Sequence, residues 1–259
     1  MRLVTWNVNS IRARLPRVLE LLDDHRPDVV CVQETKVAAA DFPHDALAVV
    51  GYQAVDCCEG RWNGVALLVR QDAEVTDVVT TLPGAPDVAE ARWIEASVDG
   101  LRIASVYVPN GREPTHPMFA AKLTFLEAMR AHAEDLVTDG PVVVAGDFNV
   151  AHEDRDVWDP AVFAGSTHVT PAERDRLDAI LEVGLIDAYR RLHPDEDGYT
   201  FFDYRMGAFR RNMGMRIDLA LVSHHLEVES ATVDTSYRRV NQAGDKPSDH
   251  APLVLDITA

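Results

Sequence analysis

Short apolar runs separated by polar segments recur along the whole chain and predict β-strands. The first runs cover residues 2–8 and 28–33, and both are too short for a core helix. Further runs of strand length follow at residues 64–70, 92–98, 101–108, 142–146, 217–222, 226–235 and 252–257. Asp99-Gly100 joins two neighbouring runs, and this dipeptide is typical of a tight hairpin turn.

Three longer segments repeat apolar residues with the period of a helix. Residues 11–25 have one apolar face and follow Ser10, a favourable N-cap, although Pro16 conflicts with a helix that begins well before it. A second helix is expected from about 119 to 137. A third begins at Thr170, whose pairing with Glu173 is a capping box, and runs to about 183. Because strands outnumber helices, we expect sheets packed on each other with helices outside.

Composition and charge narrow the choice of function only partly. The 259 residues are 47% hydrophobic, enough for a sizeable core, and no apolar run reaches the ~18 residues of a membrane span. No signal peptide is visible and the three cysteines do not suggest a disulfide framework, so we expect a cytoplasmic monomer, one domain over residues 1–259, with no membrane partner. The net charge of −17 argues against nucleic-acid binding by the surface as a whole, although it does not describe one local face.

Polar residues recur where the predicted strands end, which is where α/β scaffolds usually place functional sites. In Gly146-Asp147-Phe148-Asn149, extended backbone would point Asp147 and Asn149 the same way. A carboxylate there can orient water and an amide can stabilise phosphoryl charge; the alternative is an Asx turn that ends the strand.

Two other segments carry chemistry of the same kind. Glu34 follows a buried strand, where a carboxylate must be paired or bind a metal such as Mg²⁺ or Mn²⁺. A salt bridge to Lys36 is the simpler alternative. Ser248-Asp249-His250 places an imidazole beside a carboxylate, and such an imidazole can contact phosphate or move a proton.

These segments also match one known family in order and in type. The matching motifs are Trp6-Asn7-Val8-Asn9-Ser10, Gln33-Glu34-Thr35-Lys36, Asn63-Gly64-Val65-Ala66, Tyr107-Val108-Pro109-Asn110-Gly111, Gly146-Asp147-Phe148-Asn149, Arg216-Ile217-Asp218 and Ser248-Asp249-His250. With them the chain resembles the exonuclease III-type apurinic/apyrimidinic endonucleases of the endonuclease/exonuclease/phosphatase superfamily, from residue 1 to about 257. The resemblance implies an α/β fold, a four-layer sandwich of two packed mixed β-sheets flanked by helices.

The resemblance also implies a role for individual residues. The catalytic set is Tyr107, Asp147, Asn149, Asp218 and His250. The ligands of Mg²⁺, or of Mn²⁺ in its place, are Asn7, Glu34, Asp147, Asn149 and Asp249. The wall of a small pocket for a flipped abasic deoxyribose is formed by Phe201, Met215 and Ile217. We further expect DNA contacts from a set of residues each of which, taken alone, is more simply a solvated surface residue: Asn9, Arg12, Lys36, Arg61, Asn110, Arg112, Arg210, Arg211 and Lys246.

The implied function is Mg²⁺-dependent repair of double-stranded DNA. The enzyme would hydrolyse the phosphodiester 5′ to an abasic site, leaving a 3′-hydroxyl, and would also act as a 3′–5′ exonuclease and 3′-phosphatase. Phe201-Phe202 replaces a pair that usually contains tryptophan, and Met215 is flexible where some relatives have a rigid aromatic residue. The alternatives are therefore a 3′-end-cleaning enzyme with little abasic endonuclease activity, a phosphatase of the same superfamily with a non-nucleic-acid substrate, or a DNA-binding protein without activity.

Overall fold

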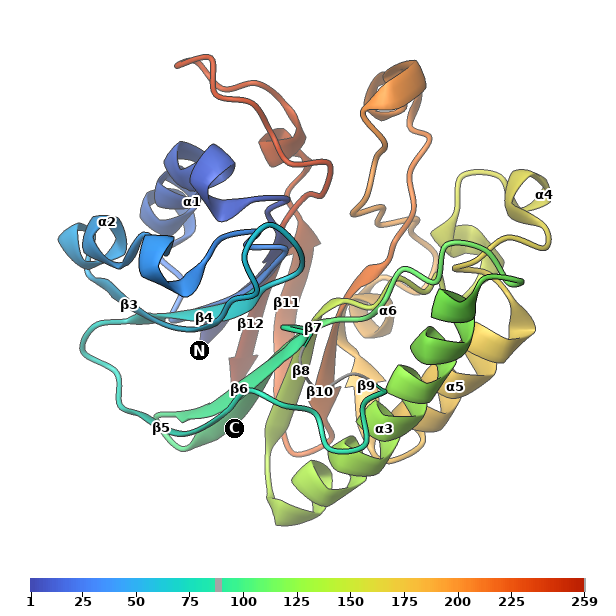
Figure 1. Ribbon diagram of the computed structural model, residues 1–259, viewed down its shortest axis with the longest axis horizontal. Helices are drawn as coiled ribbons and strands as arrows, with labels where there is room; N and C mark the ends of the chain where they lie inside the picture. Colours follow the sequence, from blue (N-terminus) through green and yellow to red (C-terminus); the bar gives the residue numbers. More distant parts are fainter. Residues whose placement is uncertain (87–89, 259) are drawn as a thin grey trace.

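Two six-stranded β-sheets pack face to face in the computed structural model, which describes residues 1–86 and 90–258 (Figure 1). The first sheet has the spatial order β11 (Glu227–Val233), β12 (Leu253–Thr258), β1 (Arg2–Asn7), β2 (Val29–Gln33), β4 (Val65–Arg70) and β3 (Tyr52–Cys57). The second has the order β5 (Val75–Val79), β6 (Trp93–Val98), β7 (Leu101–Tyr107), β8 (Val142–Asp147), β10 (Asp218–Ser223) and β9 (Leu185–Asp187). The pairs β1–β2 and β7–β8 are parallel and the other pairs antiparallel, so both sheets are mixed.

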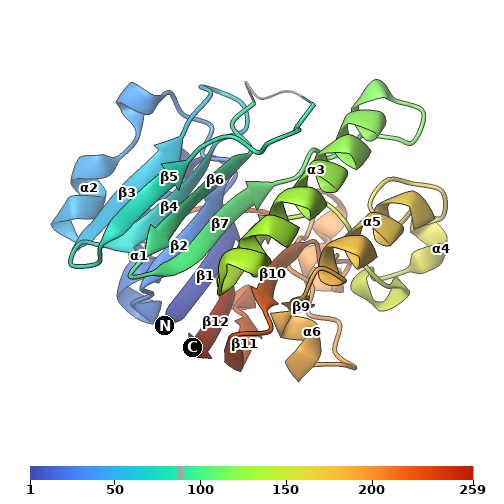
Figure 2. The same ribbon diagram turned by 90° about the horizontal axis from the view of Figure 1, so that it is seen from below.

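Helices cover the outer face of each sheet and complete the expected four layers (Figure 2). The first sheet carries α1 (Ile11–His25) and α2 (His44–Val49), and the second carries α3 (Pro117–Asp139) and α5 (Pro171–Leu181). The shorter helices are α4 (Pro160–Phe163), α6 (Ala188–Leu192) and the 3-10 turns η1 (Ala39–Asp41), η2 (Asp154–Asp156), η3 (Arg205–Gly207), η4 (Phe209–Arg211) and η5 (Thr235–Arg238). No helix among the described residues is both long enough and apolar enough to cross a membrane.

Each sheet is covered by the other sheet on its inner face and by helices on its outer face, so its strands are apolar on both faces. In β1, Leu3 packs into the core between the sheets, whereas Val4 and Trp6 pack under the helices of the first sheet. In β8, Val143 and Ala145 face the other sheet, and Val142 and Val144 face α3 and α5. This alternation explains why the strands are visible in the sequence as nearly continuous apolar runs.

The predicted elements are confirmed where local sequence determines them. Helix α1 spans residues 11–25 despite Pro16, which lies inside the helix on its exposed side. Asp99 and Gly100 both adopt positive φ between β6 and β7, as a two-residue hairpin requires, and Thr170 and Glu173 form the reciprocal capping box. The elements missed were β3, β5, β9, α2, α4 and α6, all of seven residues or fewer.

The carboxyl ends of the central parallel strands lie at one end of the sandwich. Asn7 and Gln33 are paired at the end of β1 and β2, and Tyr107 and Asp147 are paired at the end of β7 and β8. The segments that contain η3, η4 and the residues after η5 project beyond this end, in orange and red in Figure 1. Polar residues from both sheets therefore meet beneath these loops.

Candidate active site

Three polar residues form a row across the carboxyl edge of the second sheet. Asp147 lies in register with Tyr107 of β7 on one side and with Asp218 of β10 on the other. Asp147 and Asp218 are buried, whereas Tyr107 is partly exposed. Gly146 is required next to Asp147, because a Cβ atom at Gly146 would lie only 1.9 Å from the carbonyl oxygen of Val106.

His250 completes a buried acid–base cluster with this row. Its Nδ1 lies 2.8 Å from Oδ2 of Asp218, and its Nε2 lies 3.9 Å from Oδ2 of Asp147. The main chain of His250 is held from both sides, since its N–H donates to Ser248 Oγ and its carbonyl accepts from Trp6 Nε1. The ligand atoms of Asp147, Asp218 and His250 lie within 4.8 Å of one another.

The two ends of this cluster differ in their affinity for protons. Burial, together with the nearby Asp218 carboxylate, raises the pKa of Asp147 to about 7. Burial lowers the pKa of His250, but the charge and hydrogen bond of Asp218 outweigh it and raise the pKa to about 10. At neutral pH the imidazole is therefore protonated, and Asp147 binds a proton more readily than an ordinary carboxyl group does.

The backbone at Asn149 differs from the expected extended conformation. Asn149 has a φ of 52°, and its N–H donates to Oδ1 of Asp147 over 2.9 Å. This is the Asx turn that was the alternative interpretation, and it nevertheless keeps Asn149 beside Asp147. The Asn149 side chain donates to the carbonyl of Val108 and accepts from Nδ2 of Asn110 at 3.2 Å. Phe148, which lies between them in the chain, is buried in the core.

Glu34 meets this cluster from the first sheet. The Asn7 amide bridges the two sheets, since its Nδ2 donates to Oε1 of Glu34 at 2.9 Å and to Oδ2 of Asp147 at 3.0 Å. Burial raises the pKa of Glu34, but Lys36 and Asn7 together lower it below its ordinary value, so the carboxylate is charged. The alternative salt bridge between Glu34 and Lys36 is present.

A polar chain continues from Glu34 to Asp249. Lys36 Nζ donates to Oδ1 of Asn9 at 2.7 Å, and Asn9 Nδ2 donates to Oδ1 of Asp249 at 3.0 Å. The carboxylates of Glu34, Asp147 and Asp249 thus line one connected patch. Burial and the carboxylates of Glu34 and Asp147 raise the pKa of Tyr107, so its hydroxyl remains a proton donor.

The donor set of this patch fits a hard divalent cation. Carboxylate and amide oxygens are the ligands that Mg²⁺ and Mn²⁺ prefer, and the buried Oδ1 of Asp218 has no hydrogen-bond partner among the described residues. Asn7 and Asn149 are the exceptions within the predicted ligand set. Nδ2 of Asn7 faces the carboxylates and its Oδ1 accepts from the N–H of Asn9, and the Asn149 amide is engaged through both of its polar atoms. Glu34, Asp147 and Asp249 are the stronger candidates.

The residues predicted to form the pocket lie in different environments. Phe201 forms bridges to Met215 and His250, and the rings of Phe201 and His250 are 5.0 Å apart. Phe201 and Met215 line an apolar hollow of about 620 Å³ together with Trp158, Val162, Phe163, Met206 and Met213. Ile217 is 2% exposed and packs instead into the core beside Met215, with Ala151 and Val157.

The nine residues predicted to contact DNA fall into two groups. Asn9, Lys36 and Asn110 hydrogen-bond within the site. The other six, five arginines and one lysine, are exposed. Two of them have a partner on the surface, since Arg12 lies 3.9 Å from Asp41 and Arg61 stacks on Trp62. These six are Arg12, Arg61, Arg112, Arg210, Arg211 and Lys246.

Two of the three buried residues near Asn149 were missed in the sequence, and the third, Glu173, was recognised only as a helix cap. Lys122, His168 and Glu173 lie behind the Asn149 turn, and Nδ1 of His168 is 2.5 Å from the Asn149 carbonyl oxygen. Burial, reinforced by the charge of Lys122, lowers the pKa of His168 to about 4, so this imidazole is neutral. A lysine on a long helix is normally exposed, and its sequence position gives no sign of burial.

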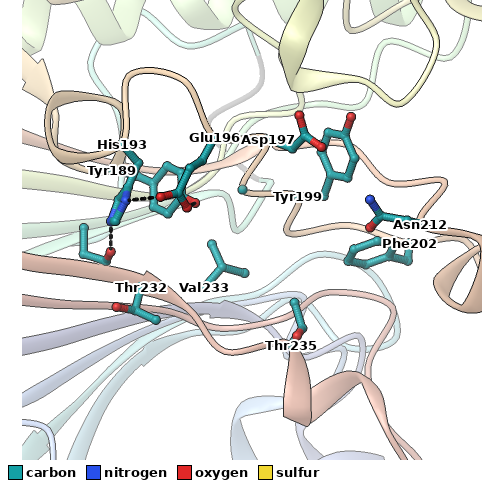
Figure 3. A pocket seen from close by; sticks show the side chains of 12 residues that line it. Tyr189, His193, Glu196, Asp197, Tyr199, Phe202, Asn212, Thr232, Val233 and Thr235 are labelled. Carbon is teal, nitrogen blue, oxygen red and sulfur yellow. Dashed lines mark hydrogen bonds and ion pairs between the residues drawn. The ribbon is translucent and has the colours of Figure 1, made fainter.

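Another hollow, of about 280 Å³, lies between α6 and β11 and has different properties (Figure 3). His193 stacks on Tyr189 there, and both of its ring nitrogens are engaged, with Glu196 at 3.0 Å and the Ala231 carbonyl at 2.8 Å. This imidazole is held as part of the fold. The acid–base cluster at the sheet edge therefore remains the candidate active site.

Comparison with known proteins agrees with this location. Residues 4–250 match the model of the Endonuclease/Exonuclease/phosphatase family. Exodeoxyribonuclease III of Haemophilus influenzae is 30% identical over 98% of both chains. Among solved structures, the 3′-5′ exonuclease NExo from Neisseria meningitidis has a TM-score of 0.95 at 37% identity, and an AP endonuclease from Archaeoglobus fulgidus has 0.93 at 35%; each covers 100% of both chains. The chain therefore belongs to the endonuclease/exonuclease/phosphatase family, as an enzyme of the exodeoxyribonuclease III and AP endonuclease type.

Proposed function

We propose that this enzyme hydrolyses phosphate esters of damaged double-stranded DNA in a Mg²⁺-dependent reaction, with Mn²⁺ as a substitute. Its main reaction is cleavage 5′ to an abasic site to leave a 3′-hydroxyl, and the same site removes nucleotides and phosphate from 3′ ends. The observation that carries the proposal is the position of Phe201, which pairs with both Met215 and His250 and whose ring lies 5.0 Å from the His250 ring. An apolar pocket beside an acid–base cluster suits a flipped deoxyribose that has no base, because this nucleotide is the least costly to flip.

The chemistry divides between an ion and the side chains. Glu34, Asp147 and Asp249, with Asn149 and Asn7 beside them, would hold the cation. When bound, the cation would neutralise charge on the phosphoryl oxygens and stabilise the leaving 3′ oxygen. Asp147 would thus serve both the ion and the water, whereas Glu34 and Asp249 would serve the ion alone.

Asp147 is the residue we assign as general base. The pKa of His250 is raised to about 10, so its imidazole is already protonated, whereas the pKa of Asp147 is about 7. His250, oriented by Asp218, would donate a hydrogen bond to the phosphoryl oxygen. Tyr107 and Asn149 offer further donors for the negative charge of the transition state.

Binding of DNA is supported by the exposed basic residues of the projecting loops and by one relative. A structure of the 3′ phosphatase NExo from Neisseria, 36% identical, contains a product DNA hairpin. Arg112, Arg210, Arg211 and Lys246 are exposed on loops of this chain and would contact phosphates without reading sequence.

A second candidate function is 3′-end cleaning with little abasic endonuclease activity. The observation that favours it is the size of the hollow beside Phe201, because Met215 closes it less firmly than a rigid aromatic residue would. The substitution Met215→Trp should therefore raise the ratio of abasic-site to intact-DNA cleavage. An unchanged ratio would count against the pocket.

The test uses three duplex oligonucleotides, each with Mg²⁺ and with EDTA. One carries an abasic-site analogue, one ends in a 3′-phosphate and one is undamaged. We expect Mg²⁺-dependent incision at the analogue with a 3′-hydroxyl product, faster than degradation of the undamaged duplex. Removal of the 3′-phosphate alone would establish the second candidate, and no cleavage of any duplex would refute both.

A further inference from the structure

We infer that Lys122, a buried lysine of α3, is a positioning residue that holds Asn149 and Asn110 in their reactive arrangement. The inference rests on the proposed function for the roles of the two asparagines. The Lys122 ammonium donates to the carbonyl oxygen of Asn149 at 2.6 Å and to that of Asn110 at 3.4 Å. It also contacts Thr167 Oγ1 and forms an ion pair with Glu173.

Stability of the fold does not explain a buried lysine at this position, because removing a charged pair from water costs free energy. The side chains of Lys122 and Glu173 are both 0% exposed, and burial lowers the pKa of Lys122 although Glu173 opposes it. Apolar pairs of similar volume replace buried ion pairs with little loss of stability, and often with a gain. The feature that an apolar pair cannot supply is a donor to two main-chain carbonyls behind the active site.

The Lys122 ammonium makes its shortest hydrogen bond to a main-chain carbonyl at Asn149. Lys122 Nζ and the nearby His168 Nδ1 both lie within 2.6 Å of this carbonyl oxygen, and they hold a residue in the left-handed conformation, with a φ of 52°. The N–H of Asn149 is bonded at the same time to Oδ1 of Asp147. Its side chain accepts from Asn110, whose own carbonyl Lys122 also contacts.

One ammonium group therefore sets the backbone of both asparagines, and Asn149 transmits the position to the catalytic Asp147. A displacement of about 1 Å at a reacting group can reduce the rate by about 100-fold. Glu173 has a separate task as well, since it caps α5 through the N–H and hydroxyl of Thr170. Glutamine serves in this capping position as well as glutamate.

The test compares Lys122→Met with the double variant Lys122→Met/Glu173→Gln. The single variant leaves a buried carboxylate unpaired and should lose stability. The double variant buries no unpaired charge, and its amide oxygen can still accept from Thr170, although the N–H of His168 then loses its acceptor. Its urea midpoint should therefore return part of the way toward wild type. We expect kcat to fall by about 10- to 100-fold in both variants, with KM within about twofold. Recovery of kcat together with stability would overturn the inference.

A readout without substrate separates this inference from the proposed function. The backbone and side-chain amide NMR signals of Asn149 should shift in both Lys122 variants and stay unchanged in Arg130→Met, a control at an exposed ion pair of the same helix. Unchanged Asn149 signals in the double variant would overturn the positioning role, whether or not the enzyme cleaves abasic DNA. Failure of wild type to cleave any duplex, with shifted signals, would overturn only the proposed function.

Discussion

His250 and Asp147 face each other with charges set by their neighbours. Asp218 lies 2.8 Å from one ring nitrogen of His250, and Asp147 lies 3.9 Å from the other. Because Asp218 holds the imidazole as a cation, the residue with an accessible proton-accepting form at neutral pH is Asp147. A single buried contact thus divides the acid and base roles.

This division predicts how His250 titrates in metal-free protein. With EDTA present, NMR should show the imidazolium through neutral pH and a pKa near 10, and Asp218→Asn should lower that pKa. Because the folded pKa lies above the ordinary value of 6.5, the charged His250 stabilises the fold fully below about pH 6.5. That contribution is lost as pH rises toward about 10. A wild-type pKa at or below 6.5 would contradict the assignment.

Individual residues were predictable from sequence only where their chemistry is unusual for their position. Glu34 at a buried strand end suggests function because burial of charge is costly. Asp249 beside His250 suggests function because an imidazole next to a carboxylate can contact phosphate or move a proton. For Asn149 the sequence left an extended strand and an Asx turn open, because the partners that hold its left-handed backbone, Lys122 among them, lie far away in the chain.

At the scale of elements, a buried ion network joins η2, β9 and the start of β10. Arg216 donates to Asp156 at 2.7 Å and to Asp187 at 2.6 Å, and all three side chains are buried. Met215 and Ile217 flank Arg216 in the chain and pack on the apolar side of the same segment. The network therefore anchors the wall beside the active site.

Removal of this anchor should be costly. Arg216→Met leaves two buried carboxylates without their main partner, so we expect the free energy of unfolding to fall by about 3–5 kcal/mol in urea denaturation. The exposed Arg130–Glu134 pair provides a control, and Arg130→Met should change it by less than about 0.5 kcal/mol. Similar losses in the two variants would refute the special role of the network.

Elements were predictable where burial on both faces gives long apolar runs, as in β2 and β8. Strand β5 was missed because it is largely exposed, and β9 because three residues give no pattern. The pairing of β9 with β10 depends on tertiary contacts rather than on local sequence. The resemblance implied the two-sheet sandwich, which apolar periodicity alone could not distinguish from other layered folds.

At the scale of the whole molecule, an acidic protein must bind a polyanion. The net charge is −17, yet Arg210, Arg211 and Lys246 are exposed on the segments that project from the active-site end. These segments are the orange and red loops of Figure 1. Local positive charge can attract phosphate while the remaining surface repels it. Affinity for DNA should therefore depend steeply on salt.

The slope of log Kd against log salt concentration tests this arrangement. Arg211→Ala and Lys246→Ala should each reduce the slope by about 1, because each removes about one phosphate contact. Arg70 is exposed at the opposite end of β4 from the site, so Arg70→Ala should leave the slope unchanged. Equal effects of all three substitutions would show that binding is not confined to the loops.

The most direct test of the account is single-turnover cleavage of an abasic duplex by Asp147→Asn. Asparagine keeps the shape of the side chain but removes the proton acceptor, so we expect the rate to fall by about 10²- to 10⁴-fold. Circular dichroism and DNA affinity should remain those of wild type. A rate close to wild type, with the same fold and affinity, would show that Asp147 is not the base and would contradict the mechanism.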